Sequence, residues 1–191
     1  MENKNIAIFC GSAFGKDPIY KEKSIKAAKA LAQHGYNLVY GGGYLGLMGQ
    51  IGETFFDEGR EVFAIMPEMF NKPTVHVKNV YTSLTVTKDM HERKAAMYEK
   101  ADAFLIFPGG IGTFDEFFEI YTWKQLRLHN KNVIIYNING FYDSLLRFLD
   151  EVHEEGFTGD AIYHALQVAN TEEELLDLIE AEPVALPNKV G

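Results

Sequence analysis

The feature that most constrains this chain is the alternation of short apolar runs with longer amphipathic stretches. The runs are rich in β-branched and aromatic residues and lie at 6–10, 37–40, 61–66, 103–107 and 133–136, with shorter extended stretches at 80–86 and 166–168. Apolar residues with helical spacing follow at 19–34, 48–58, 89–100, 113–128, 142–155 and 171–181. Such alternation is typical of β-α-β units. We therefore predict a three-layer α/β fold with a mainly parallel central sheet flanked by helices.

The length and composition favour one domain. The chain has 191 residues, of which 47% are hydrophobic, and this is enough to bury a core without metals or disulfides. No repeat, low-complexity tract or linker divides the sequence. We predict a single domain over 1–191, in which the segment 183–191 is a loosely held tail.

The charge and the cysteine content exclude several classes of function. A net charge of −9 argues against binding of nucleic acid, because a negative surface repels phosphate backbones. Cys10 is the single cysteine, so no intrachain disulfide or zinc-thiolate cluster forms, and the histidines show no ligand spacing for a metal. No apolar stretch is long enough for a signal peptide or a membrane span. We expect a cytoplasmic protein without a membrane partner.

The sequence PGGIGTFDE at 108–116 is the first candidate for a functional site. It joins the predicted strand 103–107 to a helix that we expect to begin at Thr113, so Gly109, Gly110 and Gly112 lie at the carboxyl edge of the sheet, where ligands bind in such folds. The free amide groups of a first helical turn attract anions, which predicts a phosphate. The alternative is a structural turn, in which Thr113 and Glu116 form a capping box.

The helix predicted from Asp89 carries two adjacent cations. Helical spacing places Arg93 and Lys94 on either side of a stripe that includes Met90 and Met97, so both lean toward the interior. Such charges either extend outward to water or find anionic partners. In the second case, Arg93 faces Asp115, Glu116 or a bound phosphate.

The helix 113–128 is apolar on two sides. One stripe is formed by Phe114, Phe117, Phe118 and Tyr121, and the opposite side carries Ile120 and Trp123 together with Glu116. A helix of this kind is buried on both faces. One face can pack on the sheet and the other on a second copy, so we predict a homodimer and leave open its assembly into a higher oligomer.

A second glycine-rich segment, GGGYLGLMG at 41–49, follows the second predicted strand. It matches the dinucleotide-binding pattern G-x-G-x-x-G, but it follows the wrong strand and lacks a clear ribose-binding acid. We interpret Gly42 and Gly43 as a second backbone wall of the pocket, with tight-turn packing as the alternative. Gly11 and Ser12, at the end of the first strand, are predicted to complete that wall.

Together, PGGIGTFDE, MHERKAAM at 90–97 and GGGYLGLMG resemble the LOG family of cytokinin-activating phosphoribohydrolases, whose bacterial members were long mislabelled as lysine decarboxylases. The similarity runs from FCGS at Phe9 to EEGF at Glu154. It implies a Rossmann-like fold, a dimer, and hydrolysis of a cytokinin riboside 5′-monophosphate to the free base and ribose 5-phosphate, without a cofactor. Lysine decarboxylation needs an electron sink such as pyridoxal phosphate on a lysine, and no lysine here is marked for that role.

The resemblance also assigns roles to individual residues. Arg93 and Glu116 match the catalytic pair of the family, and Met90 matches a contact to the base. The positions that match its nucleotide site are Lys94, Gly110, Ile111, Gly112, Thr113 and Thr122. A glutamate contact from the loop 67–79 has no secure counterpart, and Glu68 is the candidate.

Hydrolysis of an N-glycosidic bond passes through an oxocarbenium-like state. Glu116 is the candidate to stabilise that state, as a base for water or as a nucleophile, and Asp115 is a candidate acid for the leaving base. Two other functions remain open on the sequence. One is a general AMP nucleosidase, and the other is a nucleotide or molybdenum-cofactor carrier that binds without cleaving.

Overall fold

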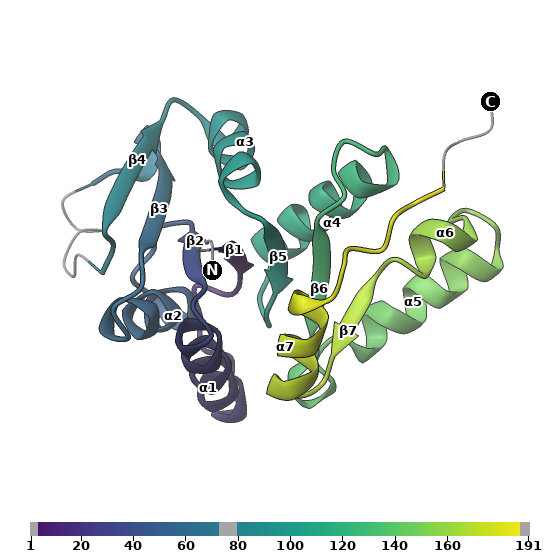
Figure 1. The fold of residues 1–191 in the computed structure, drawn as a ribbon, viewed down its shortest axis with the longest axis horizontal. Coiled ribbons are helices and arrows are strands. Elements are labelled where there is room, and N and C mark those ends of the chain that lie inside the picture. Colours follow the sequence, from purple (N-terminus) through teal and green to yellow (C-terminus); the bar gives the residue numbers. More distant parts are fainter. Residues whose placement is uncertain (1–3, 73–79, 188–191) are drawn as a thin grey trace.

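The structure, a computed structural model, describes residues 4–72 and 80–187 of the chain (Figure 1). Its strands are β1 (Asn5–Phe9), β2 (Asn37–Tyr40), β3 (Val62–Pro67), β4 (Ser83–Thr87), β5 (Ala103–Ile106), β6 (Asn132–Tyr136) and β7 (Gln167–Ala169). Its helices are α1 (Ile19–Gln33), α2 (Gly46–Asp57), α3 (Met90–Lys100), α4 (Ile111–Gln125), α5 (Asp143–Glu154), α6 (Asp160–Tyr163) and α7 (Glu172–Glu180). Two 3-10 turns are η1 (Glu68–Phe70) and η3 (Ile138–Gly140).

The strands form one seven-stranded sheet in the order β4-β3-β2-β1-β5-β6-β7, and every pair in it is parallel. The predicted parallel α/β architecture is therefore confirmed. The chain first builds outward from β1 to β4 and then crosses to β5 on the other side of β1. This reversal between β1 and β5 is the point at which ligands bind in open parallel sheets.

Helices cover both faces of the sheet, and a hydrophobic core lies under each layer. Figure 1 shows α1, α2 and α7 on one side and α3 and α4 on the other. Leu31, Phe55 and Leu175 belong to the core under the first layer, and Met97 and Phe117 belong to the core under the second. The central strands β1, β2, β5 and β6 are thus buried on both sides, which explains why their apolar runs are continuous rather than alternating, whereas the edge strand β4 is largely exposed.

Some element bounds differ from those expected from the sequence. Helix α4 begins at Ile111 rather than at Thr113, because the amides of Thr113 and Phe114 both donate to the carbonyl of Gly110. The segment 67–79 was predicted to be irregular, but it contains η1, and residues 73–79 lie outside the described ranges. The short helix α6 was not predicted, since four residues carry no periodic signal.

The described part of the tail makes contacts with the domain. Leu186 packs partly against the core beneath α3 and α4, and Arg127 donates a hydrogen bond to the carbonyl of Pro187. The prediction of a loose segment over 183–191 extends beyond the described residues and stays a prediction. In the two described ranges, no helix has the length and apolar character needed to span a bilayer.

Candidate active site

The loops that follow β1 and β5 meet at the reversal point of the sheet. The amide of Gly11, after β1, donates to the carbonyl of Pro108, after β5, at 3.0 Å. An ideal Cβ added to Gly109 would lie 2.9 Å from the amide nitrogen of Gly11 and would also overlap the side chain of Thr113. A glycine is therefore required there for the two loops to approach, as the sequence motif indicated.

The turn after β5 leads directly into the amino terminus of α4. Gly110 is the N-cap residue, and no side chain caps this end of the helix. The amides of Ile111 and Gly112 thus belong to a first turn in which backbone N–H groups lack helical acceptors. Together with the helix dipole, these groups make a site suited to an anion.

The capping-box alternative for this turn is wrong. Thr113 lies inside the helix, and its amide donates to the carbonyl of Gly110. The carboxylate of Glu116 instead pairs with Arg93, so neither residue has the role that a capping box requires. Glu116 is 7% exposed.

Arg93 and Glu116 form an ion pair between α3 and α4, with Nη1 and Oε1 3.0 Å apart. The side chain of Arg93 is 12% exposed. The alternative in which this arginine extends outward into water is therefore wrong. Its Nε donates to the carbonyl of Ile65 at 3.3 Å, and its Nη1 lies 3.8 Å from the sulfur of Met90. An ideal Cβ on Gly41 would lie 2.5 Å from Nη2 of Arg93. The first glycine of the second motif thus makes room for the arginine.

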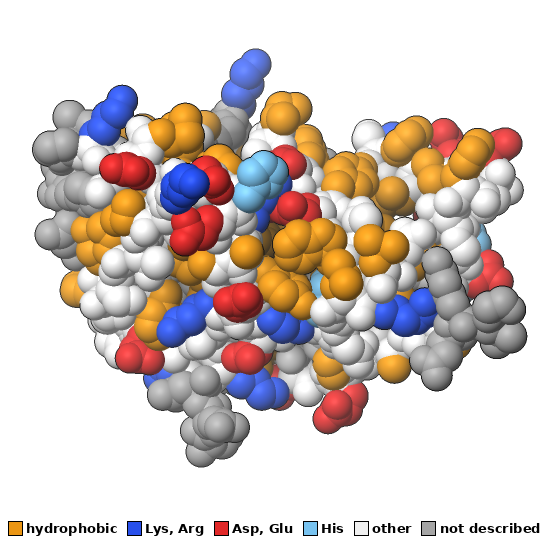
Figure 2. Space-filling model, turned by 90° about the horizontal axis from the view of Figure 1, so that it is seen from above, with side chains coloured by type: hydrophobic (Ala, Val, Ile, Leu, Met, Phe, Trp, Pro, Cys, Tyr) orange, Lys and Arg blue, Asp and Glu red, His pale blue; other side chains and the backbone are white. Residues whose placement is uncertain are grey.

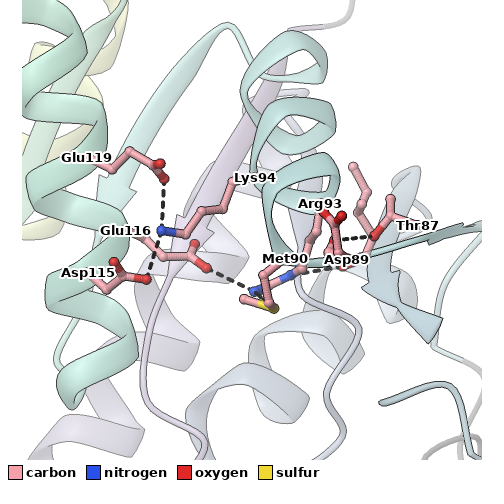
Figure 3. Close-up of polar contacts among 9 residues, drawn as sticks. Thr87, Asp89, Met90, Arg93, Lys94, Asp115, Glu116 and Glu119 are labelled. Atoms are coloured by element: carbon pink, nitrogen blue, oxygen red, sulfur yellow. Dashed lines mark hydrogen bonds and ion pairs between the residues drawn. The ribbon is translucent and has the colours of Figure 1, made fainter. Parts of the chain in front are cut away.

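Lys94 pairs with different carboxylates from those of Arg93. Its Nζ lies 2.8 Å from Oδ2 of Asp115 and 3.0 Å from Oε2 of Glu119 (Figure 3). Burial lowers the pKa of Lys94, but the hydrogen bonds to the two carboxylates outweigh it and raise the pKa overall. Lys94 is therefore charged at neutral pH.

A cavity of about 580 Å³ opens beside this cluster at the carboxyl edge of the sheet. The predicted site residues that line it are Gly11, Ser12, Gly43, Arg93, Gly110, Gly112, Thr113 and Glu116. The predicted site residues that do not line it are Gly42, Glu68, Met90, Lys94, Gly109, Ile111, Asp115 and Thr122. Three contacts account for members of the second group. Met90 contacts Arg93, and Lys94 forms an ion pair with Asp115. Gly109 packs against the side chain of Thr113. Roles toward a ligand stay predictions for both groups.

The apolar wall of the cavity was missed by sequence reasoning. It includes Tyr44 and Leu45 from the second glycine-rich segment, Met48 from α2, and Met66 and Phe70 around the end of β3. Tyr44, Leu45 and Phe70 are exposed and line the same cavity, and apolar side chains that gather in this way are typical of a binding surface. Tyr44 and Leu45 lie between glycines in GGGYLGLMG. Their position inside a glycine-rich turn was the sequence signal that could have indicated the apolar wall.

Glu116 is the carboxylate among the described residues that line the cavity. Burial raises its pKa above the ordinary value; the charges of Arg93 and Lys94 lower the pKa, and those of Asp115 and Glu119 raise it. Within the described residues, its Oε2 accepts no hydrogen bond. A buried carboxylate oxygen without a protein partner, at the wall of a cavity, is placed to act on a ligand.

Two further observations limit the chemistry of the site. In the parts of the chain that the structure describes, no group of three or more His, Cys, Asp or Glu side chains could hold a metal ion. Cys10 lines the cavity, but burial, followed by the charge of Glu116, raises the pKa of its thiol far above the ordinary range. Cys10 is thus no thiolate nucleophile at neutral pH.

The comparisons with solved structures concern the fold. A molybdenum cofactor binding protein from Rippkaea orientalis superposes with a TM-score of 0.67 at 18% identity, over 94% of this chain and 97% of that one. A Moco carrier protein from Chlamydomonas reinhardtii gives 0.68 at 16% identity, over 94% and 96%. At such low identity these matches show a shared fold alone.

The comparisons with sequences are more specific. A family model described as "possible lysine decarboxylase" matches residues 48–179. A cytokinin riboside 5′-monophosphate phosphoribohydrolase of Arabidopsis thaliana is 40% identical over 177 residues, which cover 93% of this chain and 83% of the relative. A second one from the same plant is 39% identical over 181 residues, which cover 94% and 83%. The chain therefore belongs to the LOG family, as its motifs predicted.

Proposed function

We propose that this protein hydrolyses the N-glycosidic bond of a cytokinin riboside 5′-monophosphate, or of a related purine nucleoside monophosphate, to the free base and ribose 5-phosphate. One observation carries the proposal. The buried pair of Arg93 and Glu116 opens on a cavity whose rim is the uncapped amino terminus of α4. An anion site and a carboxylate thus stand side by side, as the two ends of a ribose 5-phosphate require.

The phosphate would bind at the first turn of α4. The amides of Ile111 and Gly112 and the hydroxyl of Thr113 are the donors in reach, and both Gly112 and Thr113 line the cavity. Holding the phosphate there would fix the ribose and bring its C1′ to the buried carboxylate one helical turn further on. Positioning of this kind supplies much of the rate enhancement in such enzymes.

Glu116 would act on the anomeric carbon. Its free Oε2 is the atom that we assign to the developing positive charge of the ribose, whether it activates water or attacks directly. Arg93 would hold Oε1 through Nη1 and so fix the carboxylate, while its Nη2 is left to face the phosphate.

The apolar wall favours a base that carries a hydrophobic substituent. Tyr44, Leu45 and Phe70 present large side chains to the cavity, and adenine alone would leave much of that surface in water. A prenyl group on the base would cover it. We therefore rank a cytokinin nucleotide above AMP as the substrate.

Lysine decarboxylation, the reaction in the description of the family model, fits this cavity less well. Pyridoxal-dependent decarboxylation needs a lysine in the cavity to hold the cofactor. None of the described residues that line the cavity is a lysine, and Lys94 is held by two carboxylates outside it. Phosphoribohydrolysis, in contrast, would use Arg93 and Glu116, which line the cavity.

We also propose a homodimer in the cytoplasm. Figure 2 shows hydrophobic side chains gathered on the face of the molecule that carries α4. Ile111 and Phe118 of α4 and Leu126 just after it are exposed at helical spacing, and Thr122 lies on the same stripe. A second copy packed on this stripe would cover the apolar surface. Sedimentation showing only monomer at micromolar concentration would contradict it.

The test is release of base from a panel of nucleotides. Isopentenyladenosine 5′-monophosphate, AMP, and the corresponding nucleosides without phosphate are incubated with the protein, and free base and ribose 5-phosphate are separated by chromatography. We expect the prenylated monophosphate to have the highest kcat/KM and both nucleosides to be poor substrates. Equal turnover of AMP would indicate a general nucleosidase. Tight binding in calorimetry with no base released over hours would indicate a carrier.

A further inference from the structure

The adjacent residues Arg93 and Lys94 make separate contacts with α4. Arg93 reaches Glu116, whereas Lys94 reaches Asp115 and Glu119, which precede and follow Glu116 on the same helix (Figure 3). Three carboxylates therefore meet two cations across the junction of α3 and α4. The two cations divide those carboxylates so that no carboxylate in the cluster is unpaired.

Lys94 is more buried than Lys23, Lys26 and Lys29, which form other ion pairs of the protein. Its side chain is 15% exposed, although those of its partners Asp115 and Glu119 are 56% and 26% exposed. It does not line the cavity beside Glu116, and it lies instead over a small gap bounded by Met97 and Ile120. An action of Lys94 on the substrate in this cavity would therefore have to pass through other side chains.

The groups that face Glu116 are few and can be named. Arg93 and Lys94 approach it from α3, Asp115 and Glu119 flank it on α4, and burial together with its charge raises the pKa of Cys10 after β1. The two flanking carboxylates oppose ionisation of Glu116, and the two cations favour it. The charges of Arg93 and Glu116 are weakly screened by solvent because both side chains are poorly exposed, whereas the charge of Asp115 is screened more strongly.

We propose that Lys94 is a positioning residue, which holds α4 against α3 and offsets the charges of Asp115 and Glu119 so that Glu116 stays an ionised partner of Arg93. The proposal rests on the proposed function, in which ionised Glu116 is the reactive group. It assigns Lys94 a role through its neighbours, in place of the direct contact with the nucleotide that the family resemblance implies.

The test is the pH profile of Lys94→Gln with the substrate identified by the nucleotide panel. We expect the acid limb of kcat/KM to move to higher pH, because two uncompensated carboxylates then stand beside Glu116. The loss of activity is largest on that limb and disappears on the alkaline plateau. KM on the plateau changes by less than about twofold, since Lys94 does not touch the cavity.

Three matched variants separate charge from structure. Lys94→Arg keeps the charge and should leave the limb near its wild-type position. Lys94→Gln combined with Glu119→Gln removes one of the two carboxylates that the loss of Lys94 leaves without a cation. This double variant should move the acid limb back toward its wild-type position. Glu119→Gln alone should move the limb to lower pH. This last variant keeps the proposal testable if Lys94→Gln does not fold.

Two results would overturn the proposal. One is a large rise in KM for Lys94→Gln with an unchanged acid limb, since it means that Lys94 binds the substrate. The other is a limb that moves in none of the variants. If the wild type releases no base from any nucleotide, the proposed function fails instead. NMR titration of the Glu116 carboxyl carbon in the wild type and in Lys94→Gln then tests Lys94 separately.

Discussion

Nη1 of Arg93 and Oε1 of Glu116 lie 3.0 Å apart, although β5 separates the two helices that carry them. The pair leaves Oε2 of Glu116 without a hydrogen bond in the described structure, at the wall of the largest cavity described above. One oxygen of the carboxylate is thus fixed by the protein, and the other is buried without a hydrogen-bond partner among the described residues. This division is the geometric basis of the proposed hydrolysis.

Glu116→Gln should keep nucleotide affinity and lose nearly all turnover. The amide has the same shape and leaves the first turn of α4 intact, but it carries no negative charge opposite the ribose. Removal of such a group slows the chemical step by about 10²- to 10⁴-fold. Calorimetry gives the affinity, and chromatography gives the ribose 5-phosphate released. Near-normal release by this variant would remove Glu116 from the chemistry, and Glu99→Gln, on the exposed side of α3, is the control.

Gly41→Ala should displace Arg93. The new Cβ would lie 2.5 Å from Nη2 and 3.5 Å from Cζ of the guanidinium, so the side chain must move from Glu116. A misplacement of about 1 Å in a catalytic group can lower kcat/KM about 100-fold. The control is Gly159→Ala, because a Cβ at Gly159 meets no atom within 4 Å. Equal activity of the two variants would show that Arg93 tolerates the shift.

Tyr142→Phe should destabilise the fold near the phosphate turn. The buried Tyr142 hydroxyl donates to the carbonyl of Phe107 at 2.7 Å, directly before the glycine-rich turn. Loss of this donor leaves a buried acceptor unpaired, at about 1–3 kcal/mol. Urea unfolding measures the difference. Tyr163→Phe removes a surface bond to Asp150 and should change stability by about 0.5 kcal/mol or less. A similar loss in both variants would contradict the assignment.

Stability should fall in mildly acidic solution because of His129. Burial lowers the pKa of its imidazole, whose Nε2 contacts the carbonyl of Ile120 and whose Nδ1 accepts from the amide of Lys131. Below about pH 6.5 His129 is protonated in the unfolded chain but stays neutral in the folded protein, so the free energy of unfolding decreases as the pH falls. Thermal unfolding of the wild type should show a steeper decline than that of His129→Gln. Parallel curves would exclude this contribution.

The parallel sheet and the core of the site were predictable because they rest on local patterns. Apolar runs separated by helical periods specify β-α-β units, and PGGIGTFDE after such a run predicts a turn at the sheet edge that leads into the uncapped amino terminus of α4. An anionic partner for Arg93 was one of the two sequence alternatives, with Asp115, Glu116 and a bound phosphate all open, and the structure places Arg93 against Glu116.

Other features depend on contacts that periodicity does not record. The division of Arg93 and Lys94 between different carboxylates is decided by where α3 lies against α4. The apolar wall of Tyr44, Leu45 and Phe70 combines segments from two loops that no local pattern joins. Helix α4 begins at Ile111 because backbone amides donate to the carbonyl of Gly110. The preference of threonine for helix starts pointed to Thr113 instead.

The most direct test of the central claim is a crystal structure of Glu116→Gln with the prenylated nucleoside monophosphate bound. The account predicts that the phosphate oxygens accept from the amides of Ile111 and Gly112, and that C1′ lies next to the side chain of residue 116, with the prenyl group on the wall formed by Tyr44, Leu45 and Phe70. A phosphate bound elsewhere, or a C1′ out of contact with residue 116, would contradict it.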